Sequence, residues 1–219
     1  MAGAWELKYA GPVLVAILHT DVTTIAWSFG LRNLIIPGGY PPMPLAGMPF
    51  DMARNCAAMR ALEIGASHIF YYDSDVIAPR DTIPRLMAHD KMVVSGIYAR
   101  RSPPVSVPVM LKNGQWITSY PPNSLIEVDL VGAGCLLIKR ELLESFPPQR
   151  PSKHWFDWRV DMQGVLPREE CLSEDFTFNL ACRKMGIKTY VDTSIICRHI
   201  GYGESTPGSF VPLEACPIT

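Results

Sequence analysis

The chain has 219 residues, of which 48% are hydrophobic and 19% are charged, and its formal net charge at pH 7 is −1. This composition excludes an intrinsically disordered protein, and the length suits one domain with a full hydrophobic core. A near-zero net charge excludes a global field that would attract nucleic acid or anionic lipid. We therefore predict a single domain over residues 1–219 and no nucleic-acid partner.

An apolar run from Val13 to Leu18 is too short to cross a bilayer, so we expect no transmembrane segment. Glu6 before the run and Asp21 after it do not suit a signal peptide, and a buried first strand is the better interpretation. The six cysteines are scattered without a CxxC pair, which favours small buried thiols in a reducing compartment over a zinc site. We therefore predict a cytoplasmic protein.

Short apolar runs alternate with segments of helical periodicity, which predicts an α/β protein. Strands are expected at residues 12–19, 34–36, 68–72, 91–97, 126–138, 188–191 and 195–199. Helices are expected at residues 22–32, 51–64, 81–89 and 173–185. Asp51 and Ser173 are suitable N-caps, and Gly65 and Gly186 are suitable stops. Asn113-Gly114 predicts a hairpin turn, whereas the Pro- and Gly-rich residues 37–44 and the tail after residue 201 are expected to be loops.

Asp73, Ser74 and Asp75 directly follow the apolar strand expected at residues 68–72. Ligands of open α/β sheets gather at the carboxyl ends of strands. A slight turn would bring both carboxylates, which are one residue apart, to the same ligand zone. Mg²⁺ and Mn²⁺ take carboxylate oxygens and bridge to substrate phosphates, so this triplet is a candidate cation site. Alternatively, the two acids cap the helix that begins near Pro79.

Two further groups of polar residues come late in the chain. Glu174 and Asp175 lie in the first turn of an expected helix, where the helix dipole favours acids and where a carboxylate at a pocket rim can act as general base. His199 ends an apolar run, and its place beyond a strand makes it a candidate metal ligand, although a lone histidine is more often structural.

The order of the motifs resembles the GT-A fold glycosyltransferases, in particular small bacterial and viral members related to family 2. The motifs are Arg54-Asn55, Asp73-Ser74-Asp75, Ser95-Gly96-Ile97-Tyr98, Val131-Gly132-Ala133-Gly134-Cys135, Ser173-Glu174-Asp175 and His199. The resemblance covers about residues 12–201. It implies a single GT-A (Rossmann-like) domain with a mostly parallel central sheet flanked by helices, a small β-hairpin insertion, and a loop-like tail over residues 202–219.

The resemblance also implies an activity, namely transfer of a sugar from a UDP- or GDP-sugar to an acceptor hydroxyl with Mn²⁺ or Mg²⁺ as cofactor. It implies that Asp75 ligates the cation, that Asp73 contacts the ribose or a metal-bound water, and that His199 completes the metal shell. The nucleotide pocket implied by the family includes Thr20, Asp21, Arg54, Asp73 and Ser74. The acceptor is open: a glycan, a lipid, a protein or a small molecule.

The implied catalytic base is Asp175, with Glu174 as second choice, and this assignment implies inversion at the anomeric carbon. A retaining transferase is the alternative. The resemblance implies that Gly132-Ala133-Gly134 lets the backbone approach the donor sugar and acceptor closely. Trp155, Phe156 and Trp158 are expected to stack on sugar faces; the alternative is that they are ordinary core or surface aromatics.

The chain departs from the family in two respects. Leu34-Ile35-Ile36-Pro37 offers no base-binding aspartate, and the absence of a QxxRW motif argues against polymer synthesis. Three other interpretations compete with glycosyl transfer. A haloacid-dehalogenase phosphatase needs its DxD after the first strand, and Thr or Val where this chain has Ile77. A nucleotidyltransferase needs a GxGTR loop where residues 19–24 read HTDVTT. A non-catalytic sugar-binding domain is the third alternative.

Overall fold

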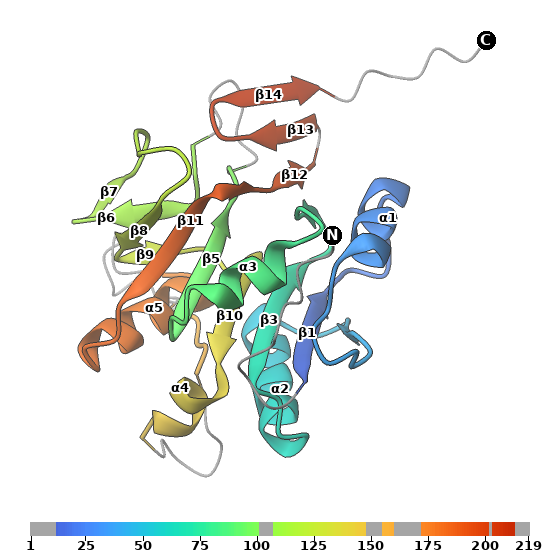
Figure 1. The fold of residues 1–219 in the computed structure, drawn as a ribbon, viewed down its shortest axis with the longest axis vertical. Coiled ribbons are helices and arrows are strands. Elements are labelled where there is room, and N and C mark those ends of the chain that lie inside the picture. Colours follow the sequence, from blue (N-terminus) through green and yellow to red (C-terminus); the bar gives the residue numbers. More distant parts are fainter. Residues whose placement is uncertain (1–11, 101–106, 148–154, 160–171, 202, 213–219) are drawn as a thin grey trace, which may run out of the picture.

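The computed structural model describes residues 12–100, 107–147, 155–159, 172–201 and 203–212. Their centre is a seven-stranded sheet with the order β2-β1-β3-β10-β5-β11-β8 (Figure 1). Its strands are β1 (Val13–Leu18), β2 (Met43–Leu45), β3 (His68–Asp73), β5 (Val93–Ile97), β8 (Leu125–Val128), β10 (Cys135–Lys139) and β11 (Thr189–Ile196). β1 pairs in parallel with β2 and β3, and β5 with β11, whereas β8 and β10 run antiparallel to their neighbours. The expected α/β class is confirmed, with a mixed sheet.

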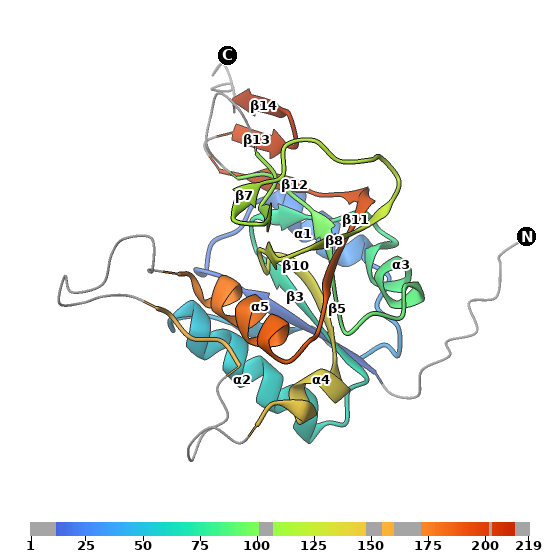
Figure 2. The same cartoon turned by 90° about the vertical axis from the view of Figure 1, so that its left-hand side faces the viewer.

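Helices cover both faces of this sheet (Figure 2). One face carries α2 (Phe50–Glu63), α4 (Arg140–Ser145) and α5 (Glu174–Lys184), and the other carries α1 (Ile25–Asn33) and α3 (Thr82–Ala88). Side chains alternate along a strand, so Tyr71 packs toward α2 while Phe70 and Tyr72 pack toward α1 and α3. Both faces of β1 and β3 are buried, which explains why these strands are apolar throughout.

Two smaller sheets flank the central one. The first joins β14 (Ser209–Pro212), β13 (Gly203–Thr206), β12 (Arg198–Ile200) and β4 (Val76–Ile77), and the second joins β7 (Gln115–Trp116), β6 (Met110–Lys112) and β9 (Leu130–Val131). Asn113 and Gly114 connect β6 to β7 with φ of 51° and 73°, as a hairpin turn of type I′ requires, so the predicted hairpin is confirmed.

Several local predictions are wrong, among them the single strand expected at residues 126–138, which is divided into β8, β9 and β10. Residues 34–36 are not a strand: Leu34 caps α1, and the strand at this sheet edge is β2, within the segment expected to be a loop. Pro44 is tolerated in β2 because an edge strand leaves one side of its backbone unpaired. The tail beyond residue 201 forms β13 and β14 around a turn at Gly208, and these strands were missed because they lack an alternating apolar pattern. Asp51 lies in the first turn of α2, whose N-cap is Pro49.

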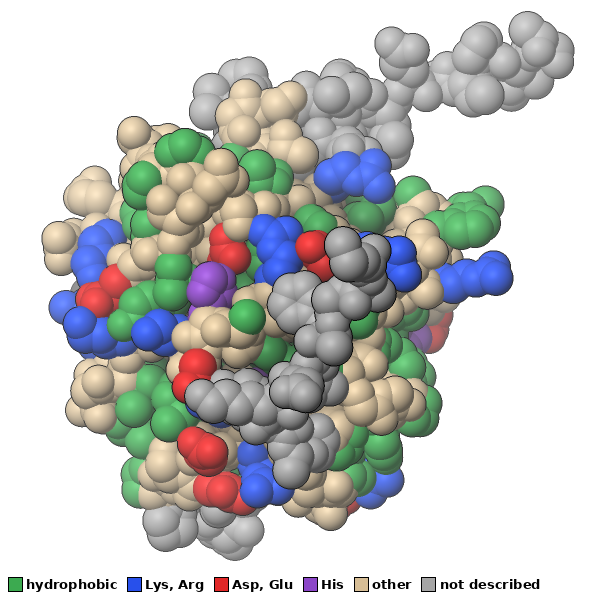
Figure 3. All heavy atoms as spheres, in the orientation of Figure 1, with side chains coloured by type: hydrophobic (Ala, Val, Ile, Leu, Met, Phe, Trp, Pro, Cys, Tyr) green, Lys and Arg blue, Asp and Glu red, His purple; other side chains and the backbone are tan. Residues whose placement is uncertain are grey.

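Acidic and basic side chains are interspersed over the face of the molecule shown in Figure 3. Of the cysteines that the structure describes, Cys56, Cys135, Cys182 and Cys197 are free, and all but Cys56 are buried. Within the described ranges, no helix combines the length and the apolar character needed to cross a membrane.

Candidate active site

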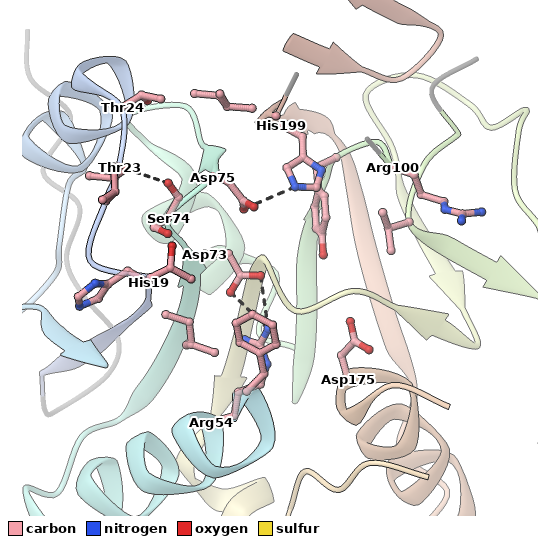
Figure 4. Close-up of a pocket in the computed structure, with 18 of the residues that line it drawn as sticks. His19, Thr23, Thr24, Arg54, Asp73, Ser74, Asp75, Arg100, Asp175 and His199 are labelled. Atoms are coloured by element: carbon pink, nitrogen blue, oxygen red, sulfur yellow. Dashed lines mark hydrogen bonds and ion pairs between the residues drawn. The ribbon is translucent and has the colours of Figure 1, made fainter. Parts of the chain in front are cut away.

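A cavity of about 680 Å³ opens beyond the carboxyl ends of β1 and β3. Of the residues that the sequence predicted for the site, it brings together Thr20, Arg54, Asp73, Ser74, Asp75, Glu174, Asp175 and His199. Figure 4 shows the Asp73–Asp75 turn on one wall, with Asp175 and Arg100 on the facing wall. The cavity therefore lies where ligands of open α/β sheets usually bind.

The acidic turn is held by the start of α1. Asp73 is the last residue of β3, and Ser74 and Asp75 form a turn that leads directly into β4. Thr23 Oγ1 donates a hydrogen bond to the carbonyl oxygen of Ser74 at 2.9 Å, and Trp27 Nε1 donates one to that of Asp73 at 3.0 Å. These bonds fix a turn that presents both carboxylates to the same cavity.

Strand pairing brings His199 next to Asp75. β12 pairs antiparallel with β4, so that His199 lies opposite Val76, and the backbone N–H of Ile200 donates to the carbonyl oxygen of Asp75 at 2.7 Å. His199 Nε2 lies 3.5 Å from Asp75 Oδ1. The ring packs edge-on against Tyr98, with 5.4 Å between the ring centroids. The imidazole is therefore held with its Nε2 toward the acidic turn.

His199 Nδ1 lies 2.7 Å from the carbonyl oxygen of Ala99. A carbonyl oxygen only accepts, so Nδ1 carries the proton and, in the neutral ring, the lone pair is on Nε2. Metal-binding histidines usually have this arrangement. Across the residues that the structure describes, however, no group of three or more His, Cys, Asp or Glu side chains is arranged to hold a metal ion.

Arg54 organises the acids beneath the cavity. It is buried, and its Nε donates to Glu174 Oε1 at 3.1 Å while its two terminal nitrogens donate to the Ala133 carbonyl and to Asp73. Burial by itself would lower the pKa of Arg54, but the carboxylates of Asp73, Glu174 and Asp175 raise it above its ordinary value. Arg54 therefore remains charged, and its hydrogen bonds go to protein partners. Arg54 was expected to contact the nucleotide, whereas in the structure it positions Asp73 and Glu174.

The same network perturbs two carboxylates. Burial raises the pKa of Asp73, with Arg54 opposing the shift and Asp75 adding to it. Burial also raises the pKa of Glu174, again opposed by Arg54. Glu174 is 4% exposed and ion-paired with Arg54, so it is poorly placed to take a proton from a substrate.

Asp175 is oriented by the backbone around it. Its Oδ1 accepts from the N–H of Phe176 at 2.8 Å and from the Ser173 hydroxyl, and its Oδ2 accepts from the N–H of Ala133 at 3.3 Å. Ser173 is the N-cap residue of α5, but its hydroxyl bonds Asp175 and caps no backbone N–H. The carboxylate is half-buried, lines the cavity, and belongs to no ion pair of the described residues.

The glycine segment does not have its expected role. Gly132, Ala133 and Gly134 are buried and do not line the cavity, because the Tyr98 phenol occupies the space beside them. A Cβ at Gly132 would come within 2.1 Å of the Tyr98 hydroxyl oxygen. The N–H of Gly134 donates to that hydroxyl at 3.0 Å. These glycines therefore admit a side chain of the protein itself, which in turn supports His199.

Two of the three aromatic residues expected to stack on sugars are in the hydrophobic core, and the third, Trp158, is 41% exposed but outside the cavity lining. Trp155 and Phe156 are 3% and 0% exposed, and Phe156 stacks on Phe178 with 4.5 Å between centroids. Asn55 holds this segment by accepting from both backbone N–H groups and donating to the Phe156 carbonyl. Asp21, which was expected in the nucleotide pocket, lies outside the cavity lining, and its side chain is 81% exposed.

Sequence reasoning missed several cavity residues. They are Leu18, His19, Val22, Thr23, Thr24, Phe50, Tyr98, Arg100, Val109, Ile200 and Gly201. The position of His19, one residue beyond the predicted first strand, was a usable signal. The sequence around Arg100 contained no such signal. Arg100 reaches the cavity where its segment pairs with residues 107 and 108, through the Ala99–Pro108 bridge and the hydrogen bond from Arg100 N–H to the Val107 carbonyl.

Comparison with solved structures identifies similar folds. A197 from STIV superposes with a TM-score of 0.63 at 18% identity, covering 93% of this chain and 95% of that chain, and at this identity the likeness shows the fold alone. A glycosyltransferase involved in the glycosylation of the major capsid of PBCV-1 matches 60% of this chain and 61% of its own length at 14% identity. Its TM-score of 0.34 is too low to indicate a shared fold. No protein-family model and no curated protein matches the sequence.

Proposed function

We propose that this protein is a glycosyltransferase that binds a nucleoside diphosphate sugar in the cavity and transfers the sugar to an acceptor hydroxyl. The observation that carries the proposal is the meeting of three features at one cavity. These are the Asp73–Asp75 turn, His199 with Nε2 toward Asp75, and Asp175 on the facing wall. A volume of about 680 Å³ is in the range of sites that hold small ligands and cofactors.

We assign the proposed divalent cation to Asp75 and His199, since the described residues bring no third His, Cys, Asp or Glu ligand into place. A carboxylate and a histidine whose Nδ1–H is bound to the Ala99 carbonyl are suitable ligands for Mn²⁺, and substrate phosphates or water would complete the shell. When bound there, the cation supplies positive charge that stabilises the departing diphosphate. Asp73, which Arg54 holds at 3.3 Å, is assigned to the nucleotide ribose or to a metal-bound water, beside Ser74 and Thr20.

Asp175 is the proposed general base. Its carboxylate accepts the acceptor's hydroxyl proton while that oxygen bonds to the anomeric carbon and the bond from this carbon to the phosphate oxygen breaks, leaving the electron pair on the diphosphate. Its backbone and Ser173 contacts hold the carboxylate toward the cavity without an opposing cation of its own. Attack opposite the leaving group inverts the anomeric centre, whereas a retaining transferase would keep its configuration.

Two measurements test the proposal. Calorimetry with UDP and with GDP, each with Mn²⁺ and with EDTA, should detect cation-dependent binding of at least one nucleotide. Incubation with a panel of UDP- and GDP-sugars should release the nucleoside diphosphate, and NMR of the transferred sugar gives its anomeric configuration. If no nucleotide binds and no donor is cleaved, the proposal is wrong. Binding without cleavage under all acceptor conditions would favour the non-catalytic alternative.

A further inference from the structure

Trp116 is an exposed aromatic residue outside the cavity lining that contacts Arg100, which lines the cavity, and Phe176, which follows Asp175 in the chain. It lies in β7 of the hairpin, and 38% of its surface is accessible. Two neighbours fix its indole: the Arg100 guanidinium lies 4.9 Å from its ring centroid, and the Phe176 ring lies 6.3 Å away at 49°. An apolar ring that is both held in place and open to solvent is a preorganised contact surface.

This surface continues the wall of the cavity. Arg100 itself lines the cavity, and its backbone N–H is anchored to the Val107 carbonyl at 2.8 Å. Phe176 follows Asp175 directly, and its N–H holds the Asp175 carboxylate. Arg100, Trp116 and Phe176, hereafter the aromatic platform, therefore lead from solvent to the carboxylate assigned to the acceptor hydroxyl.

We infer that the aromatic platform is the acceptor subsite and that the acceptor is a carbohydrate. This inference rests on the proposed function, since it names the substrate class of the same cavity. A sugar ring presents hydroxyls at its edge and C–H groups on its face. The face packs on the Trp116 indole, an edge hydroxyl reaches Asp175, and the Arg100 guanidinium donates hydrogen bonds to ring oxygens or hydroxyls.

The platform suits a saccharide better than the other acceptor classes. A lipid acyl chain would need an apolar groove, whereas Trp116 lies against the charged Arg100 guanidinium, and Arg100 lines the same cavity as Asp175. A flat aromatic ring with donors and acceptors at its rim matches the mixed polarity of a sugar. Arg100, the member of the platform that lines the cavity, lies across it from the Asp73–Asp75 turn, on the side of Asp175 (Figure 4).

Direct binding is tested by NMR of protein labelled with ¹⁵N-tryptophan. The Trp116 indole N–H signal is assigned as the one lost in Trp116→Phe. A panel of methyl glycosides and soluble oligosaccharides is then added without nucleotide. We expect at least one saccharide to shift the Trp116 signal in a saturable manner. The inference is overturned if no saccharide shifts it or if the shifts are the same in Arg100→Ala and the wild type.

Kinetics provide a second, independent test with the saccharide that stimulates nucleoside diphosphate release. Trp116→Ala should raise the KM for this saccharide about tenfold, Trp116→Phe should retain most of the affinity, and cation-dependent nucleotide binding should be unchanged in both. The control is Phe29→Ala, an exposed ring on α1 outside the cavity lining, which should behave as wild type. An unchanged KM in Trp116→Ala would refute the subsite.

The two proposals fail separately. Saccharide-dependent shifts of the Trp116 signal with no nucleotide binding would show that the platform binds carbohydrate and would refute glycosyl transfer, and with it the acceptor role. Cation-dependent donor cleavage that is stimulated by a lipid or a peptide, and by no saccharide, would leave glycosyl transfer standing and refute the carbohydrate acceptor.

Discussion

The Nδ1 nitrogen of His199 lies 2.7 Å from the carbonyl oxygen of Ala99, so that in the neutral ring the lone pair is on Nε2, which lies 3.5 Å from Asp75 Oδ1. Ala99 follows Tyr98, whose ring packs against the same imidazole. His199, the residues that orient it and the acid that faces it therefore come from three separate segments of the chain. This relationship is the basis of the first prediction.

Removal of either proposed cation ligand should weaken nucleotide binding only when Mn²⁺ is present. Asp75→Ala and His199→Ala should each weaken Mn²⁺-dependent binding of the nucleoside diphosphate by about 10- to 100-fold, because each removes a ligand from a small donor set. Calorimetry with Mn²⁺ and with EDTA measures the effect. Asp21→Ala, an exposed acid outside the cavity, is the control. Equal losses with and without Mn²⁺ would contradict the assignment.

Replacement of the proposed base should separate binding from transfer. Asp175→Asn keeps the size of the side chain and its capacity to accept the Phe176 N–H, but it removes the proton acceptor. We expect the transfer rate to fall by about 10²- to 10⁴-fold while nucleotide binding stays within about twofold. Initial rates of nucleoside diphosphate release, paired with calorimetry, measure both. A variant that still transfers at the wild-type rate would exclude Asp175 as base.

Removal of the buried Arg54 guanidinium should destabilise the whole fold. Arg54→Met leaves Asp73 and Glu174 without their partner in a buried position, which should cost about 3–5 kcal/mol of unfolding free energy. Arg60→Met is the matched control on the same helix, because its exposed pair with Glu63 is screened by solvent and should contribute little to stability. Urea unfolding measures both, and equal effects of the two changes would contradict the role of Arg54.

Burial of His68 should make the fold sensitive to mild acid. Desolvation lowers the pKa of His68 to about 4, from about 6.5 in an unfolded chain. The unfolded state therefore binds the proton first as the pH falls, so stability is lost between about pH 6.5 and pH 4 and is unaffected above that window. Urea unfolding at several pH values should show a steeper loss in the wild type than in His68→Gln. Parallel pH profiles would exclude His68 as the source.

A methyl group at Gly132 should displace the Tyr98 phenol. Gly132→Ala places a Cβ within 2.1 Å of the Tyr98 hydroxyl oxygen and 2.8 Å of Val109 Cγ1, so we expect a loss of about 1–3 kcal/mol. Tyr98→Phe removes the closest contact, and the double variant should therefore lose less than the sum of the single changes. A double-mutant cycle by urea unfolding measures the coupling. Additive losses would show that the two residues do not interact.

Part of this architecture could be read from local pattern. The unbroken apolar runs of β1 and β3 predicted strands buried on both faces, and the Asn113-Gly114 pair predicted the hairpin turn. The position of Asp73 and Asp75 at the end of β3 was also predictable, since the apolar run stops there. These features depend on side-chain periodicity and backbone preferences within a few residues, which one sequence displays directly.

The local sequence pattern predicted the wrong structure for other segments, because it contains no information on which segments pair or pack together. β2 contains Pro44 and forms only because β1 offers it an edge, and Phe156 is a core residue only because Phe178 and Tyr71 cover its ring. In both cases the nearby sequence favours a different interpretation. The energetic reason for the observed structure lies in residues distant along the chain.

The sequence by itself determined the fold class, the main strands, and the acids that follow β3 and begin α5. Tertiary structure alone decided which of these residues share a cavity. Asp75 and His199 meet because β4 pairs with β12, and Arg54 contacts acids rather than solvent because α2 packs beside β3 and α5. Local propensity selects the elements, whereas long-range pairing and burial select the neighbours, and the proposed chemistry depends on the neighbours.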